Sequence, residues 1–220
     1  MVAITQLIPR PERPAQPDER TGALVRLKAL HAEAEETARL ANLLGRSMHA
    51  AIALPVLGVV AVGLSDAMYP ASQLVWMGFV IAVSIAMLIS YRHAMKKPFE
   101  RAALKLFAKD LSAILLFAGF AWGSGAFLVL PVGSSAIAAL LFALAPAVVV
   151  AYLLRDFEAL YLFLAPVGSL SLVASFLKPF ADGVLAAALV LAGSLIIAGV
   201  TLYFRRVTGA ASRPAMLSLP

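Results

Sequence analysis

Few residues in this chain have the type and spacing needed for chemistry. Gly123-Ser124-Gly125 has the form of a turn that presents a nucleophilic serine. Such a serine needs a base within hydrogen-bond reach, and no apolar run of this chain carries a histidine at its middle. Glu35 and Glu36 lie in a polar segment and lack the spacing of a metalloprotease's paired glutamates. We therefore expect no catalytic residues and predict that this chain is not an enzyme.

The chain also has few residues that could bind a metal ion or a cofactor. The chain has no cysteine, so it offers no thiolate ligand and no disulfide. His49 begins the first apolar run, where an interfacial anchor or a packing role explains it better than a ligand role. The ionisable residues that border the apolar runs all lie at run ends: Asp66, Asp110, Arg155, Asp156, Glu158 and Asp182. Charges at mid-membrane mark ion pathways, so we predict no such pathway, no metal site and no haem or other cofactor.

Six apolar runs dominate the chain and define its elements. They are residues 48–65, 73–91, 111–130, 136–154, 159–177 and 183–204. A helix needs about 20 apolar residues to cross the hydrocarbon core, and each run has nearly that length or more. Hydrophobic residues make up 62% of the chain and charged residues 14%. We predict an all-α polytopic membrane bundle of six transmembrane helices, preceded by an N-terminal cytoplasmic amphipathic helix.

The basic residues predict the orientation of this bundle. Lysine and arginine near helix ends stay preferentially on the cytoplasmic side. With a cytoplasmic N-terminus, segments 1–47, 92–110, 155–158 and 205–220 hold every basic residue except Lys178. We predict a bacterial inner-membrane protein with both termini cytoplasmic. This topology accounts for the net charge of +6, so nucleic acid is not expected as a partner.

The chain divides into four predicted segments. Residues 1–21 are a proline-rich tail, 22–46 an amphipathic cytoplasmic helix, 47–206 the transmembrane domain and 207–220 a cytoplasmic tail. The helix has one apolar stripe at three- and four-residue spacing: Leu27, Leu30, Ala34, Thr37, Ala41 and Leu44. It could lie on the inner leaflet or pack against protein, and the acidic residues at its middle favour protein.

Six basic residues of the 92–110 loop are candidate contacts for lipid head groups. They are Arg92, Lys96, Lys97, Arg101, Lys105 and Lys109. The simpler explanation is that they only fix the topology. The second half of this loop is amphipathic, with Phe99, Ala103, Leu106 and Phe107 on one side.

Small residues, prolines and one tryptophan are the candidates for the bundle interior and for contact with a ligand. They are Trp122, Gly119, Gly123, Pro146 and Pro166. Glycines four residues apart let helices approach closely, and proline kinks a helix. We predict that Trp122 points inward and packs against a proline-kinked span, either as plain core or as part of a ligand site. Five aromatic residues near span ends are predicted to form an interfacial belt: Trp76, Tyr91, Tyr152, Tyr161 and Tyr203.

Several features in order resemble a known class of membrane domain. They are Leu74-Val-Trp76, the Tyr91-Arg92-His93 end of the second run, Gly119-Phe-Ala-Trp122-Gly123, Phe163-Leu-Ala-Pro166 and the final Phe204-Arg205-Arg206. Their order resembles the multi-pass N-terminal input module of bacterial sensor histidine kinases and diguanylate cyclases. That resemblance implies signal relay in a two-component or cyclase system through an output domain. No kinase or cyclase signature follows Arg206 in this chain.

Three functions remain open. The first is a non-catalytic sensory or regulatory module that relays a membrane or small-ligand stimulus to a cytoplasmic output. The second is a small permease for an uncharged solute, and the third is an anchor or assembly protein that recruits a cytoplasmic partner. The expected partners are the lipid bilayer, a second copy in a homodimer and a cytoplasmic signalling protein.

Overall fold

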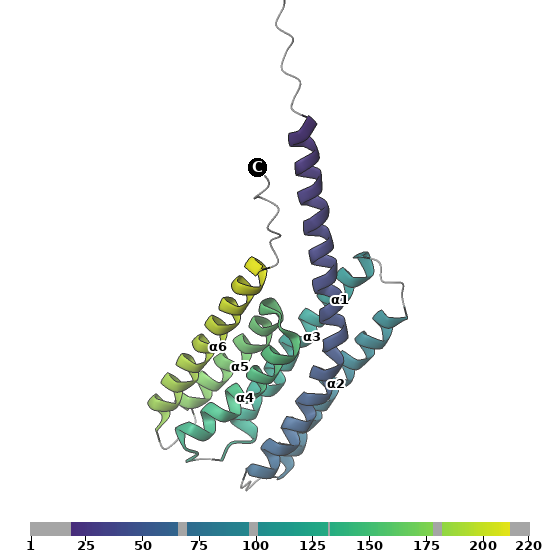
Figure 1. The fold of residues 1–220 in the computed structure, drawn as a ribbon. Coiled ribbons are helices and arrows are strands. Elements are labelled where there is room, and N and C mark those ends of the chain that lie inside the picture. The colour runs from purple at the N-terminus through teal and green to yellow at the C-terminus, as the bar shows by residue number, and fades with distance from the viewer. Residues whose placement is uncertain (1–18, 66–69, 97–100, 132, 178–181, 212–220) are drawn as a thin grey trace, which may run out of the picture. The chain divides into compact units, whose positions relative to one another are not determined.

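The computed structural model describes residues 19–65, 70–96, 101–131, 133–177 and 182–211, and every regular element among them is a helix. The helices are α1 (Glu19–Leu64), α2 (Pro70–Met95), α3 (Arg101–Leu128), α4 (Ala136–Leu154), α5 (Phe157–Leu177) and α6 (Gly183–Ala211), labelled in Figure 1. Each of these six helices contains a stretch long and apolar enough to cross a membrane. The chain is a multi-pass, all-helical membrane protein, as the six apolar runs predict.

The helix ends differ from the predicted ones mainly around the basic loop. α2 continues to Met95 and α3 begins at Arg101, so most of the predicted 92–110 loop is helical. The cause is packing, because Leu104 and Phe107 are buried on the face that continues through Leu111. Leu106 was placed on the same side as Phe107, but Leu106 is exposed whereas Phe107 is buried. Phe99 lies outside the described residues.

The chain forms two compact units, Met1–Arg39 and Leu40–Pro220, and their boundary lies inside α1. The membrane domain was expected to begin at residue 47. That membrane boundary stays a prediction. The second compact unit begins at Leu40, and Leu40, Leu43 and Leu44 are buried in its core. Further along α1, Ser47, Ala50, Ala51 and Leu54 continue this buried stripe at helical spacing.

In the first unit, the described side chains from Leu24 to Arg39 belong to α1. Leu24, Leu27 and Leu30 are exposed along one side of the helix. His31 Nε2 lies 3.2 Å from Glu35 Oε1, one turn away, and this surface pair adds little to helix stability. Of the apolar stripe predicted for this helix, Leu27, Leu30 and Ala34 are exposed in the first unit, whereas Leu44 is buried in the core of the second.

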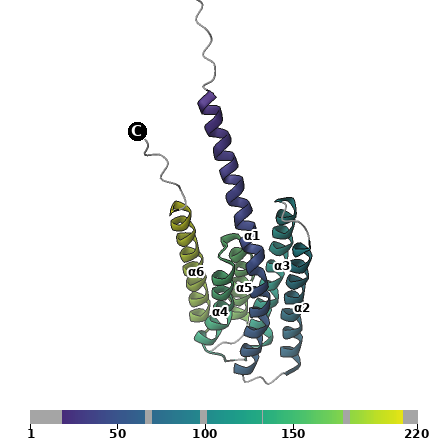
Figure 2. The ribbon, with the colours of Figure 1, turned by 45° about the vertical axis from the view of Figure 1, so that its right-hand side comes forward.

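α3 and α5 form the centre of the second unit. α3 contacts α2, α4 and α5, while α5 also contacts α4 and α6. Half of the most apolar window of α5 is buried and 44% of that of α3, against 17% for α6. In Figures 1 and 2, α6 lies at the outside of the bundle, beside α4 and α5. α3 and α5 are therefore the two most buried of the six helices.

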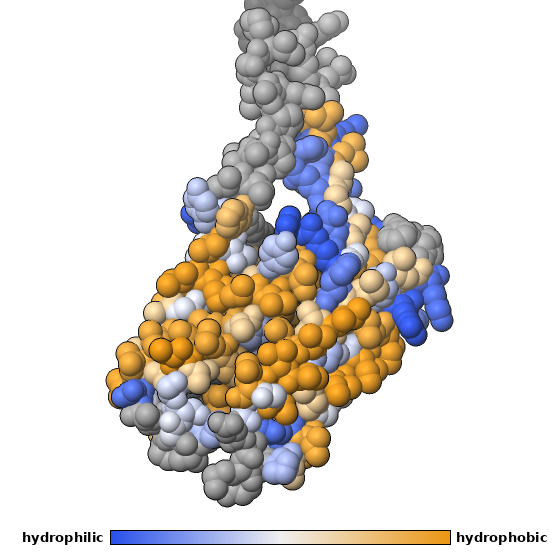
Figure 3. All heavy atoms as spheres, turned by 60° about the horizontal axis from the view of Figure 1, so that its bottom comes forward, coloured by the Kyte–Doolittle hydropathy of each residue, from blue (hydrophilic) through white to orange (hydrophobic). Residues whose placement is uncertain are grey.

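The outward faces of the bundle are apolar. Large exposed hydrophobic residues line α1, α2 and α6, among them Val56, Val59, Leu74, Phe79, Ile85, Leu191, Leu195 and Ile196. Figure 3 shows hydrophobic residues, in orange, over most of the described bundle face that it presents. Soluble proteins rarely expose contiguous apolar patches above a few hundred Å². This surface suits contact with lipid chains.

Two residues make the turn between α4 and α5. Arg155 ends α4 in the left-handed conformation, with φ 51°, and its N–H donates to the carbonyl of Ala151. Asp156 is buried, and its Oδ1 accepts from the N–H groups of Glu158 and Ala159 at 3.0 and 3.1 Å. Asp156 is thus the N-cap of α5, which satisfies two backbone donors that the first turn of a helix leaves free.

Candidate functional site

A glycine face on α3 sets the contact with α5. Gly119 and Gly123 lie four residues apart, so they share one face of the helix. A Cβ on Gly119 would clash with the carbonyl oxygen of Phe163 and with the ring of Pro166. A Cβ on Gly123 would lie 3.0 Å from Leu170 Cβ and 3.1 Å from the Pro166 carbonyl oxygen. The bare glycines therefore let α3 lie directly against the proline-bearing part of α5.

Three aromatic side chains from three helices meet beside this face. Trp76 of α2, Trp122 of α3 and Phe142 of α4 are 0%, 3% and 9% exposed. The two indoles meet edge to face with ring centroids 5.2 Å apart, and Trp122 stacks on Phe142 at 5.6 Å. Trp76 and Phe142 are 5.7 Å apart, so each ring contacts both others. We call these three residues the aromatic cluster.

Trp122 donates a hydrogen bond that compensates for a proline. Its Nε1 lies 2.8 Å from the carbonyl oxygen of Phe142 and donates to it. In an α-helix that carbonyl would accept from the N–H four residues later, but that residue is Pro146, which has no N–H. The indole of α3 therefore supplies the donor that α4 lacks. This bond joins the two helices at a buried point where an unpaired carbonyl would be costly.

Trp76 is held in the same cluster by a second bond. Its Nε1 donates to the carbonyl oxygen of Ala121 at 2.8 Å. Gly125 makes room for this arrangement, because a Cβ there would clash with the ring of Phe142 and lie 2.6 Å from Trp76 Nε1. Both buried indole donors are thus satisfied, as buried tryptophans require.

The prediction that Trp76 belongs to an interfacial aromatic belt is wrong. Trp76 is fully buried because the Gly125 face of α3 accepts the ring and Ala121 accepts its proton. Tyr152, Tyr161 and Tyr203 are exposed near helix ends, where the belt was expected. Tyr91 is half-buried and packs against the core.

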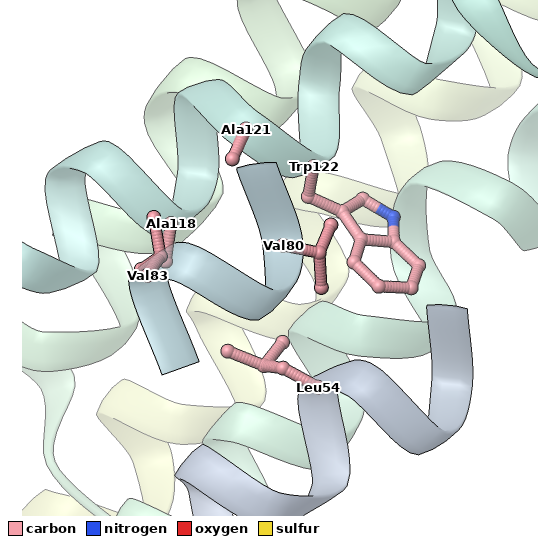
Figure 4. Close-up of a pocket in the computed structure, with 6 residues that line it drawn as sticks. All are labelled: Leu54, Val80, Val83, Ala118, Ala121 and Trp122. Carbon is pink, nitrogen blue, oxygen red and sulfur yellow. The ribbon is translucent and has the colours of Figure 1, made fainter. Parts of the chain in front are cut away.

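A narrow apolar recess adjoins the cluster. Figure 4 shows its lining from α1, α2 and α3: Leu54, Val80, Val83, Ala118, Ala121 and Trp122. The recess has no polar lining, and a water-sized sphere does not fit inside it. Leu54 directly precedes Pro55, which removes one backbone hydrogen bond from α1. The recess therefore places an apolar contact beside a locally weakened step of α1.

The structure places all five candidate interior residues inside the bundle. All five are buried: Trp122, Gly119, Gly123, Pro146 and Pro166. Trp122 packs against α4, the span that contains Pro146, as predicted. Contact of these residues with a ligand remains a prediction. Ser124 donates locally to the carbonyl of Ala121, and His49 is exposed. Among the described residues, no group of three or more histidine or acidic side chains is arranged to hold a metal ion.

The candidate head-group residues lie at the connected ends of α2 and α3. Arg92, Lys96, Lys105 and Lys109 are exposed, and Arg101 is half-buried. Lys97 lies outside the described residues. Their contact with lipid head groups remains a prediction.

Phe142 is the member of the cluster that sequence reasoning missed, although a signal for its carbonyl was present. Phe142 stands four residues before Pro146, so its carbonyl must find a donor outside the backbone of α4. No protein-family model, curated protein or solved structure matches this chain. The function must therefore be argued from the geometry of the cluster, the recess and α1.

Proposed function

We propose that this chain is a non-catalytic sensory or regulatory membrane module. It responds to the state of the bilayer or to a small apolar ligand and relays that response to a cytoplasmic output. The proposal includes residence in a bacterial inner membrane with both termini cytoplasmic, as the basic residues favour.

The observation that carries this proposal is the continuity of α1. This helix has 46 residues, while a membrane crossing takes about 20. One helix therefore includes both the exposed leucines of the first unit and Leu54, which lines the recess in the second. A displacement at the Leu54–Pro55 step can pass along a continuous helix, because its hydrogen bonds resist local bending except at proline.

The packing of the bundle supports a relay in which the movement is confined to the Leu54–Pro55 step of α1. α2, α3 and α4 are fixed to one another by the aromatic cluster and its two indole hydrogen bonds. Beside this cluster, the recess is lined only by apolar side chains and touches α1. A change in bilayer thickness would act most readily there.

The exposed leucines favour a second candidate function. Leu24, Leu27 and Leu30 form an apolar stripe in the first unit. An anchor protein would use such a stripe to bind an amphipathic helix of a cytoplasmic partner. This function needs no response to the bilayer, so it can be separated from the first by experiment.

The test uses pairs of spin labels, which the absence of native cysteine makes straightforward. Ala32→Cys in the first unit and Lys109→Cys in α3 are labelled, and the distance distribution between them is measured by pulsed electron paramagnetic resonance. The protein is reconstituted in vesicles of short-chain and of long-chain phosphatidylcholine. A relay predicts a distance distribution that changes with bilayer thickness.

Two substitutions on α2 show whether the recess takes part. Val83→Phe adds bulk to the lining of the recess and should abolish the change, while Val75→Phe adds the same bulk at an exposed position and should preserve it. One distribution at all thicknesses, or an unaltered response in V83F, would count against the relay. The anchor function would then be tested by the loss of partner binding in Leu27→Glu.

A further inference from the structure

Most serine and threonine hydroxyls described in this bundle bond within their own helix, whereas Ser72 of α2 donates to the Leu128 carbonyl of α3. The hydroxyls bonded within a helix donate to a carbonyl three or four residues earlier in it, as hydroxyls in apolar surroundings commonly do. The bundle residues that do so are Ser47, Ser84, Ser112, Ser124, Ser169, Ser175 and Thr201. A hydroxyl without such a bond leaves unused a carbonyl that lies within reach in its own helix.

Two buried hydroxyls among the described residues make no such bond. The Oγ atoms of Ser171 in α5 and Ser194 in α6 are buried and have no hydrogen-bond partner in the protein. Ser171 as a whole is 4% exposed. In an apolar interior, a hydroxyl without a partner is unfavourable. A hydrogen-bond partner from outside its own helix would therefore stabilise each hydroxyl.

Both serines lie at the contact between α5 and α6. The Ser194 Oγ lies 3.5 Å from the position that a Cβ on Gly168 would take. Ser171 follows Gly168 by three residues and so shares its side of α5. α5 from Ala159 to Leu177 and α6 from Gly183 to Phe204 contain no charged residue. A charged ligand would find no counter-charge on either helix, whereas a neutral hydroxyl can both donate and accept.

We propose that Ser171 and Ser194 form a site for one small uncharged molecule that carries a hydroxyl group, either water or a short-chain alcohol. The molecule accepts from one serine, donates to the other and so joins α6 to α5 within the membrane. The site does not depend on the proposed relay, because its residues lie on two other helices.

The first test is a double-mutant cycle of thermal stability in detergent, with Ser171→Ala, Ser194→Ala and the double variant. Each single substitution should lower the melting temperature, because it removes one of the two anchors of the bound molecule. The double variant should melt close to the less stable single variant, since the first alanine already releases that molecule. Ser175→Ala, whose hydroxyl donates to the Ser171 carbonyl, is the matched control and should not couple to S194A.

Single variants that melt higher than the native protein, or single effects that add in the double variant, would overturn the site. Nuclear magnetic resonance then identifies the occupant. Cross-peaks from water to the amides of residues 168–171 that vanish in the double variant indicate water. Cross-peaks from the methyl group of added 1-propanol indicate an alcohol, and the absence of both kinds would again overturn the proposal.

Discussion

At the scale of single residues, the bundle is governed by a proline and by the side chain that compensates for it. Pro146 leaves the Phe142 carbonyl without its helical donor, and Trp122 supplies one from α3. A buried carbonyl that loses its partner costs about 1–3 kcal/mol. The tryptophan therefore contributes through its N–H as well as through the packing of its rings.

Trp122 contributes both its rings and its N–H to the stability of the bundle. Trp122→Ala removes both and leaves a cavity, so we expect a loss of about 3–5 kcal/mol in the free energy of unfolding, as for large core truncations. Equilibrium unfolding in mixed micelles measures this loss. A variant as stable as the native protein would show that Trp122 does not support the bundle.

Gly125 is the residue on which the aromatic cluster depends for space. We expect Gly125→Ala to destabilise the bundle by at least about 1–3 kcal/mol, because its methyl group would overlap Phe142 and Trp76. Gly78→Ala on α2 is the matched control, since a Cβ there meets nothing within 4 Å. Thermal unfolding should separate the two variants, and equal melting temperatures would contradict this account of Gly125.

At the scale of elements, the α4–α5 turn depends on a helix cap. Asp156→Ala should cost about 0.5–2 kcal/mol, because two N–H groups at the start of α5 lose their acceptor. Asp156→Asn keeps an acceptor oxygen and should retain most of the stability. Thermal unfolding of the two variants checks this ranking, and a D156N variant as unstable as D156A would assign the effect to charge rather than to capping.

The elements were predicted from sequence with uneven success, for physical reasons. The run 136–154 matches α4 because Ser135 caps it and the turn at Arg155 ends it. The extension of α3 to Arg101 was missed, because basic residues mask a buried face carried by Leu104 and Phe107. Trp76 was misplaced because its burial depends on Gly125, in another helix, and apolar content near a span end does not reveal such a contact.

The candidate site was predicted only in part. Trp122 and the small residues around it could be placed inside the bundle, since glycine spacing reports close helix contact. Phe142 and the recess depend on how α1, α2 and α4 pack around α3, which no single stretch of sequence encodes.

At the scale of the whole molecule, the arrangement of basic residues predicts the orientation. In intact cells, Ala71→Cys at the start of α2 should react with a membrane-impermeant maleimide, and Ala32→Cys in the first unit should not. Both positions are exposed, and the chain has no native cysteine, so accessibility alone decides the outcome. Both should react after the membrane is opened with detergent. The reverse pattern in intact cells would place the N-terminus outside.

The central claim is that one indole hydrogen bond joins α3 to α4 because Pro146 lacks an N–H. A double-mutant cycle of unfolding free energies with Trp122→Phe and Pro146→Ala tests it directly. Alone, W122F should cost about 1–3 kcal/mol, because the Phe142 carbonyl is left without a donor. With P146A the restored backbone N–H can occupy that carbonyl, so W122F should cost markedly less and the two effects should not add. An equal cost of W122F in both backgrounds would contradict the claim.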